Sequence, residues 1–280
     1  MINEKEDKQQ KGLYYTFTGG GKKAMEKVVY FPKLFEVGCI GKLRIRNRIV
    51  MTPMARQFQG LNGEVTQRTI DYFGERAKGG VGLIIVGSSR VFPPGHQFFT
   101  TASLNLSDDR YLPGHAELVR LVHAYGAKVG IQFGHVGGQG FRQPVVAASD
   151  VQQYFCDGTP YPKPRPLTRG EIYDVIELFG KGALRARMAG YDLVEIHAAH
   201  DYLLGSFLSP RLNRRTDEFG GNLENRARFV VEIVKEIKRV AGSDFPVSVR
   251  ISADDYLEGS ITTAESPRIC LLYTSPSPRD

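Results

Sequence analysis

Five runs of apolar and β-branched residues recur along the chain, each about the length of one strand. The runs cover residues 48–54, 81–89, 128–135, 192–200 and 246–252. Apolar residues follow one another in each run with few polar interruptions, so neither side of the segment would face water. This pattern is typical of strands buried on both faces of a parallel sheet.

Between these runs the apolar positions adopt the spacing of an amphipathic helix. The predicted helices span residues 66–78, 112–125, 168–189 and 222–241. Thr168 forms a capping box with Glu171 three residues later, and Gly190 is placed to end the same helix. Strands that alternate with helices indicate βα units.

The ends of the predicted strands carry polar or small residues suited to a site. These residues are Thr52, Pro53, Gly87, Ser88, Gln132, His135, His197, His200 and Arg250. No GxGxxG or GxxxxGK motif follows the first strand, which argues against a doubly wound nucleotide-binding fold. Functional residues at the carboxyl ends of the strands are typical of a barrel. We therefore predict an α/β fold, a (β/α)8 TIM barrel of which about the first five βα units are present.

Composition supports one globular domain with no membrane partner. Of the 280 residues, 41% are hydrophobic and 24% are charged, which is ordinary for a domain with a buried core. The longest apolar stretch, residues 81–86, is far shorter than the ~20 residues of a membrane helix. The first ten residues lack the apolar core of a secretory signal, which predicts a cytoplasmic protein. Residues 1–30 are polar without a sustained period and are predicted to be a flexible extension.

Charge and cysteine content exclude several classes of site. The net charge of +7 comes from Lys and Arg interspersed with acids along the whole chain, and no nucleic-acid-binding motif is present. We therefore expect no nucleic-acid partner. The three cysteines are odd in number and show no CxxC spacing, so neither a disulfide framework nor an internal metal or iron–sulfur site is predicted.

His197 and His200 allow three interpretations. A zinc site expects two histidines four apart on a helix and a third ligand, whereas these are three apart at a strand end. The rings could instead be core residues bonded to backbone carbonyls. As a third interpretation, two N–H donors side by side suit a substrate oxygen on which negative charge develops.

Three further side chains need a partner or suggest chemistry. Tyr202 could donate a proton or simply pack with its hydroxyl tied to a loop. Arg250 is a charge on a predicted buried strand, which requires a bound anion or a carboxylate. Gln132 offers a donor and an acceptor that match the edge of a pyrimidine-like ring, although a backbone hydrogen bond would also satisfy it.

The chain resembles the old yellow enzyme family of FMN-dependent NAD(P)H oxidoreductases over most of its length, from about Phe31 to about Glu265. The matching segments include LFEVGCIGKLRIRNRIVMTPM, GLIIVGSSRV, IQFGHVGG, PLTRGEI, AGYDLVEIHAAHDYLLGSFLSPRLNRRTDEFGGNLENRARF and FPVSVRISADDYLEG. It is most similar to the bacterial branch with 2,4-dienoyl-CoA reductases, 2-enoate reductases and bile-acid-inducible flavin oxidoreductases. The resemblance implies a barrel with FMN across its carboxyl-terminal mouth.

The resemblance also implies roles for individual residues. Flavin contacts would come from Pro53, Met54, Ala55, Ser88, Gln132 and Arg250, with Gln132 on the pyrimidine edge and Arg250 beside N1 and O2. His197 and His200 would hold the oxygen of an activated alkene, and Tyr202 would donate a proton. The implied reaction is ping-pong: NADH or NADPH reduces the flavin, which then reduces the C=C bond of an enone, enoate or enoyl thioester.

The chain departs from the family pattern at several positions. Ala55 stands where relatives often carry Cys or Thr, Gly138 replaces an Arg, and Asp201 replaces a Gly. The additional carboxylate of Asp201 is expected to raise the pKa of the two histidines or to bind a cation. The partial FMN-binding barrel is assigned to residues 31–266. Residues 267–280 are expected to be a non-native tail that ends a helix at Pro267.

Alternatives to an active ene reductase remain at this point. One is a truncated, catalytically inert barrel that binds no flavin, and another is a different FMN barrel dehydrogenase. An iron–sulfur cluster is expected only in a longer parent protein. The expected partner is a small-molecule alkene substrate, and a homo-oligomer is compatible with the sequence.

Overall fold

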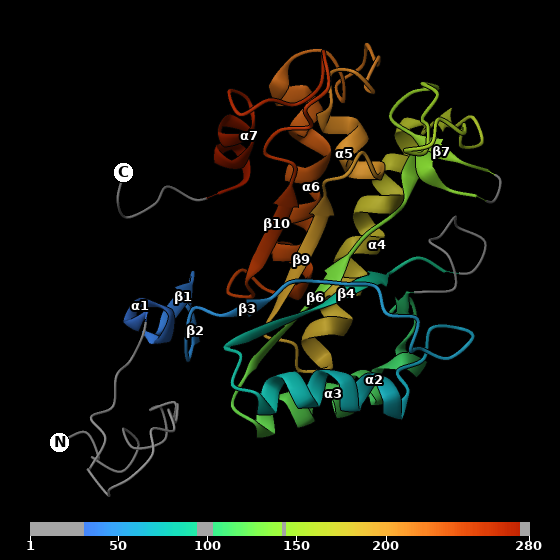
Figure 1. Ribbon diagram of the computed structural model, residues 1–280. Helices are drawn as coiled ribbons and strands as arrows, with labels where there is room; N and C mark the ends of the chain where they lie inside the picture. Colours follow the sequence, from blue (N-terminus) through green and yellow to red (C-terminus); the bar gives the residue numbers. More distant parts are fainter. Residues whose placement is uncertain (1–30, 94–102, 142–143, 275–280) are drawn as a thin grey trace, which may run out of the picture.

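The computed structural model describes residues 31–93, 103–141 and 144–274, and Figure 1 shows how they are arranged. The predicted flexible extension, residues 1–30, lies outside the described residues.

The centre of the fold is a parallel sheet whose strands neighbour one another in sequence order. The strands are β3 (Val50–Met51), β4 (Leu83–Arg90), β6 (Lys128–Phe133), β9 (Leu193–Ala198) and β10 (Val247–Ile251). The short β5 (Leu104–Asn105) pairs with the end of β4. Sequential parallel pairing produces the arc of a barrel, whereas a doubly wound sheet would reverse its strand order. The sheet thus has the topology predicted from the sequence.

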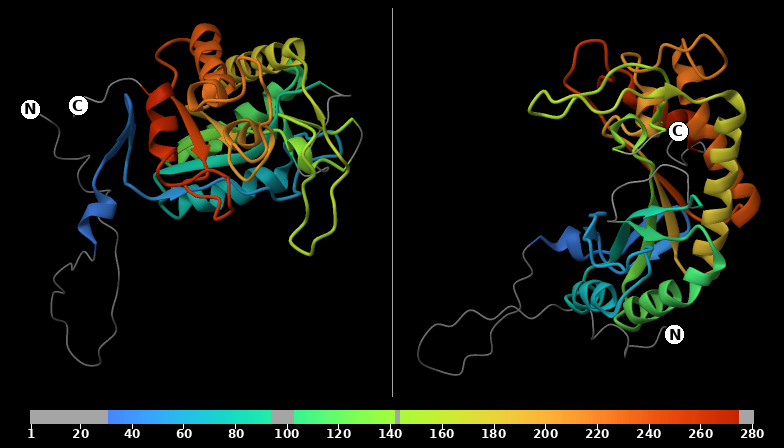
Figure 2. Two further views of the ribbon diagram at one scale, coloured as in Figure 1. Left: turned by 90° about the horizontal axis from the view of Figure 1, so that it is seen from above. Right: turned by 90° about the vertical axis from the view of Figure 1, so that its right-hand side faces the viewer.

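Four long helices cover one face of this arc, as the right-hand view of Figure 2 shows. They are α2 (Gln67–Lys78), α3 (Leu112–Ala124), α4 (Arg169–Met188) and α6 (Leu223–Ala241). The predicted capping box at the start of α4 is present, and Gly190 follows the helix with φ +91°. Both observations confirm the helix limits expected from the sequence.

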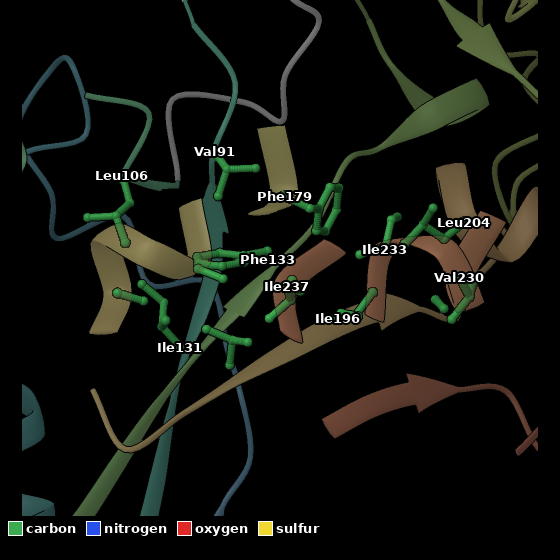
Figure 3. Close-up of a cluster of buried hydrophobic side chains, with 14 of the residues drawn as sticks. Val91, Leu106, Ile131, Phe133, Phe179, Ile196, Leu204, Val230, Ile233 and Ile237 are labelled. Carbon is green, nitrogen blue, oxygen red and sulfur yellow. The ribbon is translucent and has the colours of Figure 1, made fainter. Parts of the chain in front are cut away.

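The main core lies between the helices and alternate residues of the strands. Figure 3 shows part of it, including Ile131 and Phe133 of β6, Ile196 of β9, Phe179 of α4 and Ile233 of α6. All five side chains are fully buried. Because successive residues of a strand point to opposite faces, the remaining alternate positions face the inside of the arc.

The inner face is apolar at its base and polar above it. Ile45, Leu83, Ile85 and Leu193 form a small buried cluster at the base. Ile45 comes from an antiparallel hairpin of β1 (Gly38–Ile40) and β2 (Leu43–Ile45), which follows the short helix α1 (Pro32–Phe35). Further along β9, two and four residues after Leu193, the same face carries Glu195 and then His197.

Loops at the carboxyl ends of the strands carry short elements. These are the 3-10 turns η1 (Asp109–Tyr111) and η2 (Gly137–Gln139), the strand pair β7 (Val146–Ala147) and β8 (Arg165–Pro166), and the buried helix α5 (Leu203–Leu208). Polar side chains hold the segment between α5 and α6 in place. Asn213 Nδ2 donates to the carbonyls of Phe207 and Phe219, and Arg215 pairs with Asp217.

Two expectations about local structure are wrong. Pro267 does not end a helix; it lies in the first turn of α7 (Ser266–Tyr273), where the missing N–H of proline costs no hydrogen bond. The first and fifth strands are not buried on both faces, because β3 and β10 lie at the two edges of the described sheet. Val50 of β3 is exposed, and all five residues of β10 are half-buried.

Candidate active site

The strand register brings the predicted site residues of β6, β9 and β10 together on the inner face. Gln132 of β6 lies opposite Glu195 of β9, and Arg250 of β10 lies opposite His197. In a parallel sheet, residues paired in register share a face. The amide, the guanidinium and the first histidine therefore line one surface near the carboxyl end of the arc.

His197, His200 and Tyr202 form a compact cluster of rings. The ring centroids are 4.9 Å apart for the two histidines, 5.1 Å for His197 and Tyr202, and 5.9 Å for His200 and Tyr202. His197 is buried at the end of β9, whereas His200 is exposed and Tyr202 is half-buried in the loop that leads into α5. The cluster thus runs from the barrel wall to the surface of the mouth.

Hydrogen bonds define where each histidine carries its proton. The Ala199 N–H donates to His197 Nδ1 at 3.3 Å, so the neutral ring of His197 carries its proton on Nε2. That Nε2–H donates to His200 Nδ1 at 3.2 Å. His200 is then protonated on Nε2. Only this second N–H is left to face a ligand, whereas the sequence suggested two parallel donors.

The environment keeps all three rings uncharged at neutral pH. Burial, together with the nearby His200 and Arg250, lowers the pKa of His197 to about 3. Partial burial, aided by Arg250, also lowers the pKa of His200, although Asp255 opposes the shift. Burial raises the pKa of the Tyr202 hydroxyl. The cluster therefore offers a neutral imidazole donor and a phenol that retains its proton.

Asp201 does not act on the histidines as expected. Its carboxylate pairs with Arg211 at 2.6 Å, and the pKa values of both histidines are lowered rather than raised. The cation that Asp201 binds is thus supplied by the chain itself.

Gln132 has a partner that sequence reasoning missed. Its Nε2 donates to Glu195 Oε1 at 2.8 Å, while Ser248 Oγ donates to Glu195 Oε2 at 2.9 Å. This arrangement leaves Gln132 Oε1 facing away from Glu195 as an acceptor. The signal in the sequence was a glutamate within an apolar strand run, two residues before His197 and therefore on the same face.

The ends of β3 and β4 also meet. A Cβ added to Gly87 would lie 2.9 Å from Pro53 Cβ and 2.8 Å from Gln132 Cβ, so these two side chains crowd the glycine. Met54 and Ser88 line a cavity of about 20 Å³. Ala55 is exposed next to them in the chain. Pro53, Met54 and Ser88 thus lie close together near the carboxyl ends of β3 and β4.

Several of these groups fit the ring of FMN. The Ser88 hydroxyl oxygen is buried without a hydrogen-bond partner in the part of the chain that the structure describes. Within those same residues the half-buried Arg250 guanidinium has no hydrogen-bond or ion-pair partner. Buried polar groups are normally satisfied, so an unpaired hydroxyl and an unpaired cation, together with the Gln132 side chain, suit a ring whose edge carries hydrogen-bond donors and acceptors.

Other kinds of site find no support in the described ranges. Residues 31–93, 103–141 and 144–274 contain no group of three or more His, Cys, Asp or Glu side chains arranged to hold a metal ion. Across the same ranges no helix is both long enough and apolar enough to cross a membrane.

Comparison with known proteins assigns the family. Residues 33–275 match the model of the NADH:flavin oxidoreductase / NADH oxidase family. The chain belongs to this family. Its members are oxidoreductases that use FMN with NADH or NADPH as the hydride donor, and they include the old yellow enzymes. The resemblance, the cofactor prediction and the barrel fold are therefore confirmed.

Individual relatives show how far the similarity extends. The chain is 46% identical to an NADH oxidase of Thermoanaerobacter brockii over 251 residues, which cover 88% of this chain and 38% of that enzyme. It is 40% identical to an NADPH dehydrogenase of Halalkalibacterium halodurans, covering 81% of this chain and 65% of the relative. The chain thus spans between about one third and two thirds of these curated relatives.

Solved structures give the same picture. A 2-naphthoyl-CoA reductase complex aligns with a TM-score of 0.77 at 28% identity, covering 87% of this chain and 39% of that one. Morphinone reductase in complex with tetrahydroNAD aligns with a TM-score of 0.72 at 32% identity, covering 84% of this chain and 68% of that one.

Proposed function

We propose that this site reduces a carbon–carbon double bond conjugated to a carbonyl group, with NADH or NADPH as the source of hydride. The observation that carries the proposal is the bonded pair His197–His200 beside Tyr202, level with Arg250 across β9 and β10. This arrangement places a neutral N–H donor and a neutral phenol next to the groups that fit a flavin. The names of two similar structures, a naphthoyl-CoA reductase and morphinone reductase, support a substrate of this class.

The flavin would be held by the side chains at the strand ends. Gln132 and Arg250 would bind the polar edge of the ring, and Ser88, Pro53, Met54 and Ala55 would line its other side. When bound, FMN supplies hydride transfer between the nicotinamide and the alkene carbon. The fixed positive charge of Arg250 favours a ring that gains negative charge.

His200 would bind the substrate oxygen. Hydride addition to the β-carbon of a conjugated alkene moves negative charge onto that oxygen, so a donor already in place lowers the barrier. Since His197 donates to His200 Nδ1, the His200 ring is held with Nε2–H as its outward donor. His197 thus orients the group that touches the substrate.

Tyr202 would deliver the proton to the α-carbon. Its raised pKa keeps the hydroxyl protonated at neutral pH, and the ring lies 5.9 Å from that of His200. A proton donor next to the oxygen-binding group suits an addition in which hydride and proton reach adjacent carbons. The nicotinamide and the alkene would use the same mouth in turn, which gives ping-pong kinetics.

Replacing Tyr202 by Phe tests the assignment. Stopped-flow absorbance of the flavin measures its reduction by NADH or NADPH and its reoxidation by an enone in separate experiments. We expect Tyr202→Phe to leave reduction unchanged and to slow reoxidation by on the order of 10²–10⁴-fold, the usual contribution of general acid catalysis.

The matched control is Tyr173→Phe, a half-exposed tyrosine on the outer helix α4, which should alter neither step. Equal slowing of both half-reactions in Tyr202→Phe would reject the proton-donor role. Failure of the purified chain to take up FMN would reject the activity of this polypeptide and favour the inert alternative.

A further inference from the structure

The backbone turns a sharp corner at Asp201, which lies between His200 and Tyr202. His200 and Asp201 both have left-handed backbone conformations, with φ of +62° and +56°. Residues with a Cβ adopt this region at a cost, and Asp and His tolerate it better than most. The corner turns the chain from the end of β9 into α5 and carries His200 on one side and Tyr202 on the other.

Polar side chains from other loops satisfy the backbone of this corner. Ser252 Oγ accepts from the His200 N–H at 3.3 Å, and Gln139 Nε2 donates to the His200 carbonyl at 2.8 Å. Gln153 Nε2 donates to the Asp201 carbonyl at 3.3 Å. The main chain is thus held by neutral groups, and none of these contacts uses the Asp201 carboxylate.

The carboxylate makes a separate contact that bridges α5. Asp201 precedes this helix and Arg211 follows it, and Arg211 Nη2 lies 2.6 Å from Asp201 Oδ2. The side chains are only 19% and 29% exposed, so solvent screens the pair less than a surface ion pair. The pair therefore ties the residue between His200 and Tyr202 to the far end of a buried helix.

We propose that the Asp201–Arg211 ion pair is a positioning device that fixes the corner and so sets where His200 and Tyr202 meet the substrate. Glycine would adopt the backbone conformation of residue 201 more easily but would leave the corner without this tether. The catalytic part of this inference rests on the proposed ene reduction, whereas the structural part concerns the ring geometry alone.

A direct electrostatic role of Asp201 on the histidines is a poorer account of the same contacts. The Arg211 guanidinium compensates the carboxylate, and the pKa values of His197 and His200 are lowered. The shift of His200 is opposed by Asp255 and favoured by Arg250.

Substitutions at the two ends of the pair test the proposal in the full chain. Asp201→Asn removes the charge while keeping a residue that tolerates the left-handed region, and Arg211→Leu removes the other partner. Arg211→Lys keeps the charge. Arg185→Leu is the matched control because Arg185 pairs with Asp109 at the same 2.6 Å on the helical layer, with a side chain 21% exposed.

The kinetic readout separates the two half-reactions. We expect Asp201→Asn and Arg211→Leu each to slow reoxidation by the alkene by about tenfold or more, since small displacements of positioned groups cost that much, while reduction by the nicotinamide is unchanged. The double variant should be no slower than the worse single variant, because both remove one contact. Arg211→Lys should recover most of the rate, and Arg185→Leu should match the wild type.

The second readout needs neither flavin nor turnover. Nitrogen-15 NMR of the histidine side chains reports which ring nitrogen carries the proton and whether His200 Nδ1 accepts a hydrogen bond. We expect this signal to change in Asp201→Asn and Arg211→Leu and to stay as in the wild type in Arg185→Leu. Urea unfolding of each variant confirms that it folds.

The outcomes distinguish the two proposals. If the histidine signal and the reoxidation rate both stay unchanged in the tether variants, the positioning role is wrong. An altered histidine signal in a chain that never reduces an alkene would support the tether and remove the proposed function. Slowing of both half-reactions together would also overturn the positioning role, because a general structural defect would explain it.

Discussion

Replacing Glu195 by Leu should destabilise the fold through the groups that the carboxylate leaves behind. Glu195 is only 8% exposed and accepts from Gln132, which is 3% exposed, and from the half-buried Ser248. Leucine fills a similar volume, so the loss arises from hydrogen bonding rather than from a cavity. The Gln132 amide loses its partner in a buried place, whereas the Ser248 hydroxyl can turn toward water.

The size of the effect follows from these two environments. A buried donor without a partner costs about 1–3 kcal/mol, and the half-buried serine adds less, so we expect the free energy of unfolding to fall by about 2–4 kcal/mol. Urea unfolding followed by circular dichroism measures this change, provided that the transition is two-state.

A variant that removes all three polar groups is the control. When donors and acceptor are replaced together by apolar residues of similar shape, the cost of an unpaired group disappears. Glu195→Leu combined with Gln132→Leu and Ser248→Ala should therefore be more stable than Glu195→Leu alone. If the free energy of unfolding of Glu195→Leu alone lay within about 0.5 kcal/mol of the wild type, the range of ordinary surface changes, the reasoning would be refuted.

Two further predictions concern pH and packing. Burial lowers the pKa of His115 to about 4 and of His197 to about 3, so below about pH 6.5 the unfolded chain binds protons that the native state refuses. As the pH is lowered toward 4, the free energy of unfolding should fall by up to about 1.4 kcal/mol per pH unit for each histidine. Urea unfolding of His115→Asn should show a weaker dependence of this free energy on pH. A dependence equal to that of the wild type would contradict the lowered pKa of His115. Gly182→Ala should cost about 1–3 kcal/mol by urea unfolding, because its new methyl group would meet Val91. Gly170→Ala on the same helix has nothing within 4 Å of the added carbon and should stabilise by up to about 1 kcal/mol; equal effects at the two positions would exclude packing as the cause.

The elements that the sequence predicted well are those set by local patterns. The helix from Arg169 to Met188 follows from its apolar spacing and from the Thr168–Glu171 capping box, which act within a few residues of each other. The first strand was predicted as residues 48–54, yet only Val50 and Met51 pair with β4. The length of this strand depends on how many of its residues pair with β4, and no local sequence pattern encodes that number.

The candidate site was predictable as a set of residues but not as a network. The position of His197, Gln132 and Arg250 near strand ends was enough to bring them to one surface. The Glu195 contacts depend on the register between three strands, which the apolar runs leave undetermined. The left-handed corner at His200 depends on hydrogen bonds from Gln139, Gln153 and Ser252, which lie 48 to 61 residues away in the sequence, so its geometry has no local signature.

The sequential order of the sheet has a consequence for synthesis on the ribosome. Each of β4, β6, β9 and β10 pairs with an earlier strand of the sheet, and among the described strands of this sheet only the two-residue β5 lies between two such partners in the chain. A nascent chain can therefore start from the β3–β4 pair and add one strand and its helix at a time. Each addition leaves a fresh row of unpaired backbone groups at the growing edge, which makes cotranslational growth from the amino-terminal side the natural route to this fold.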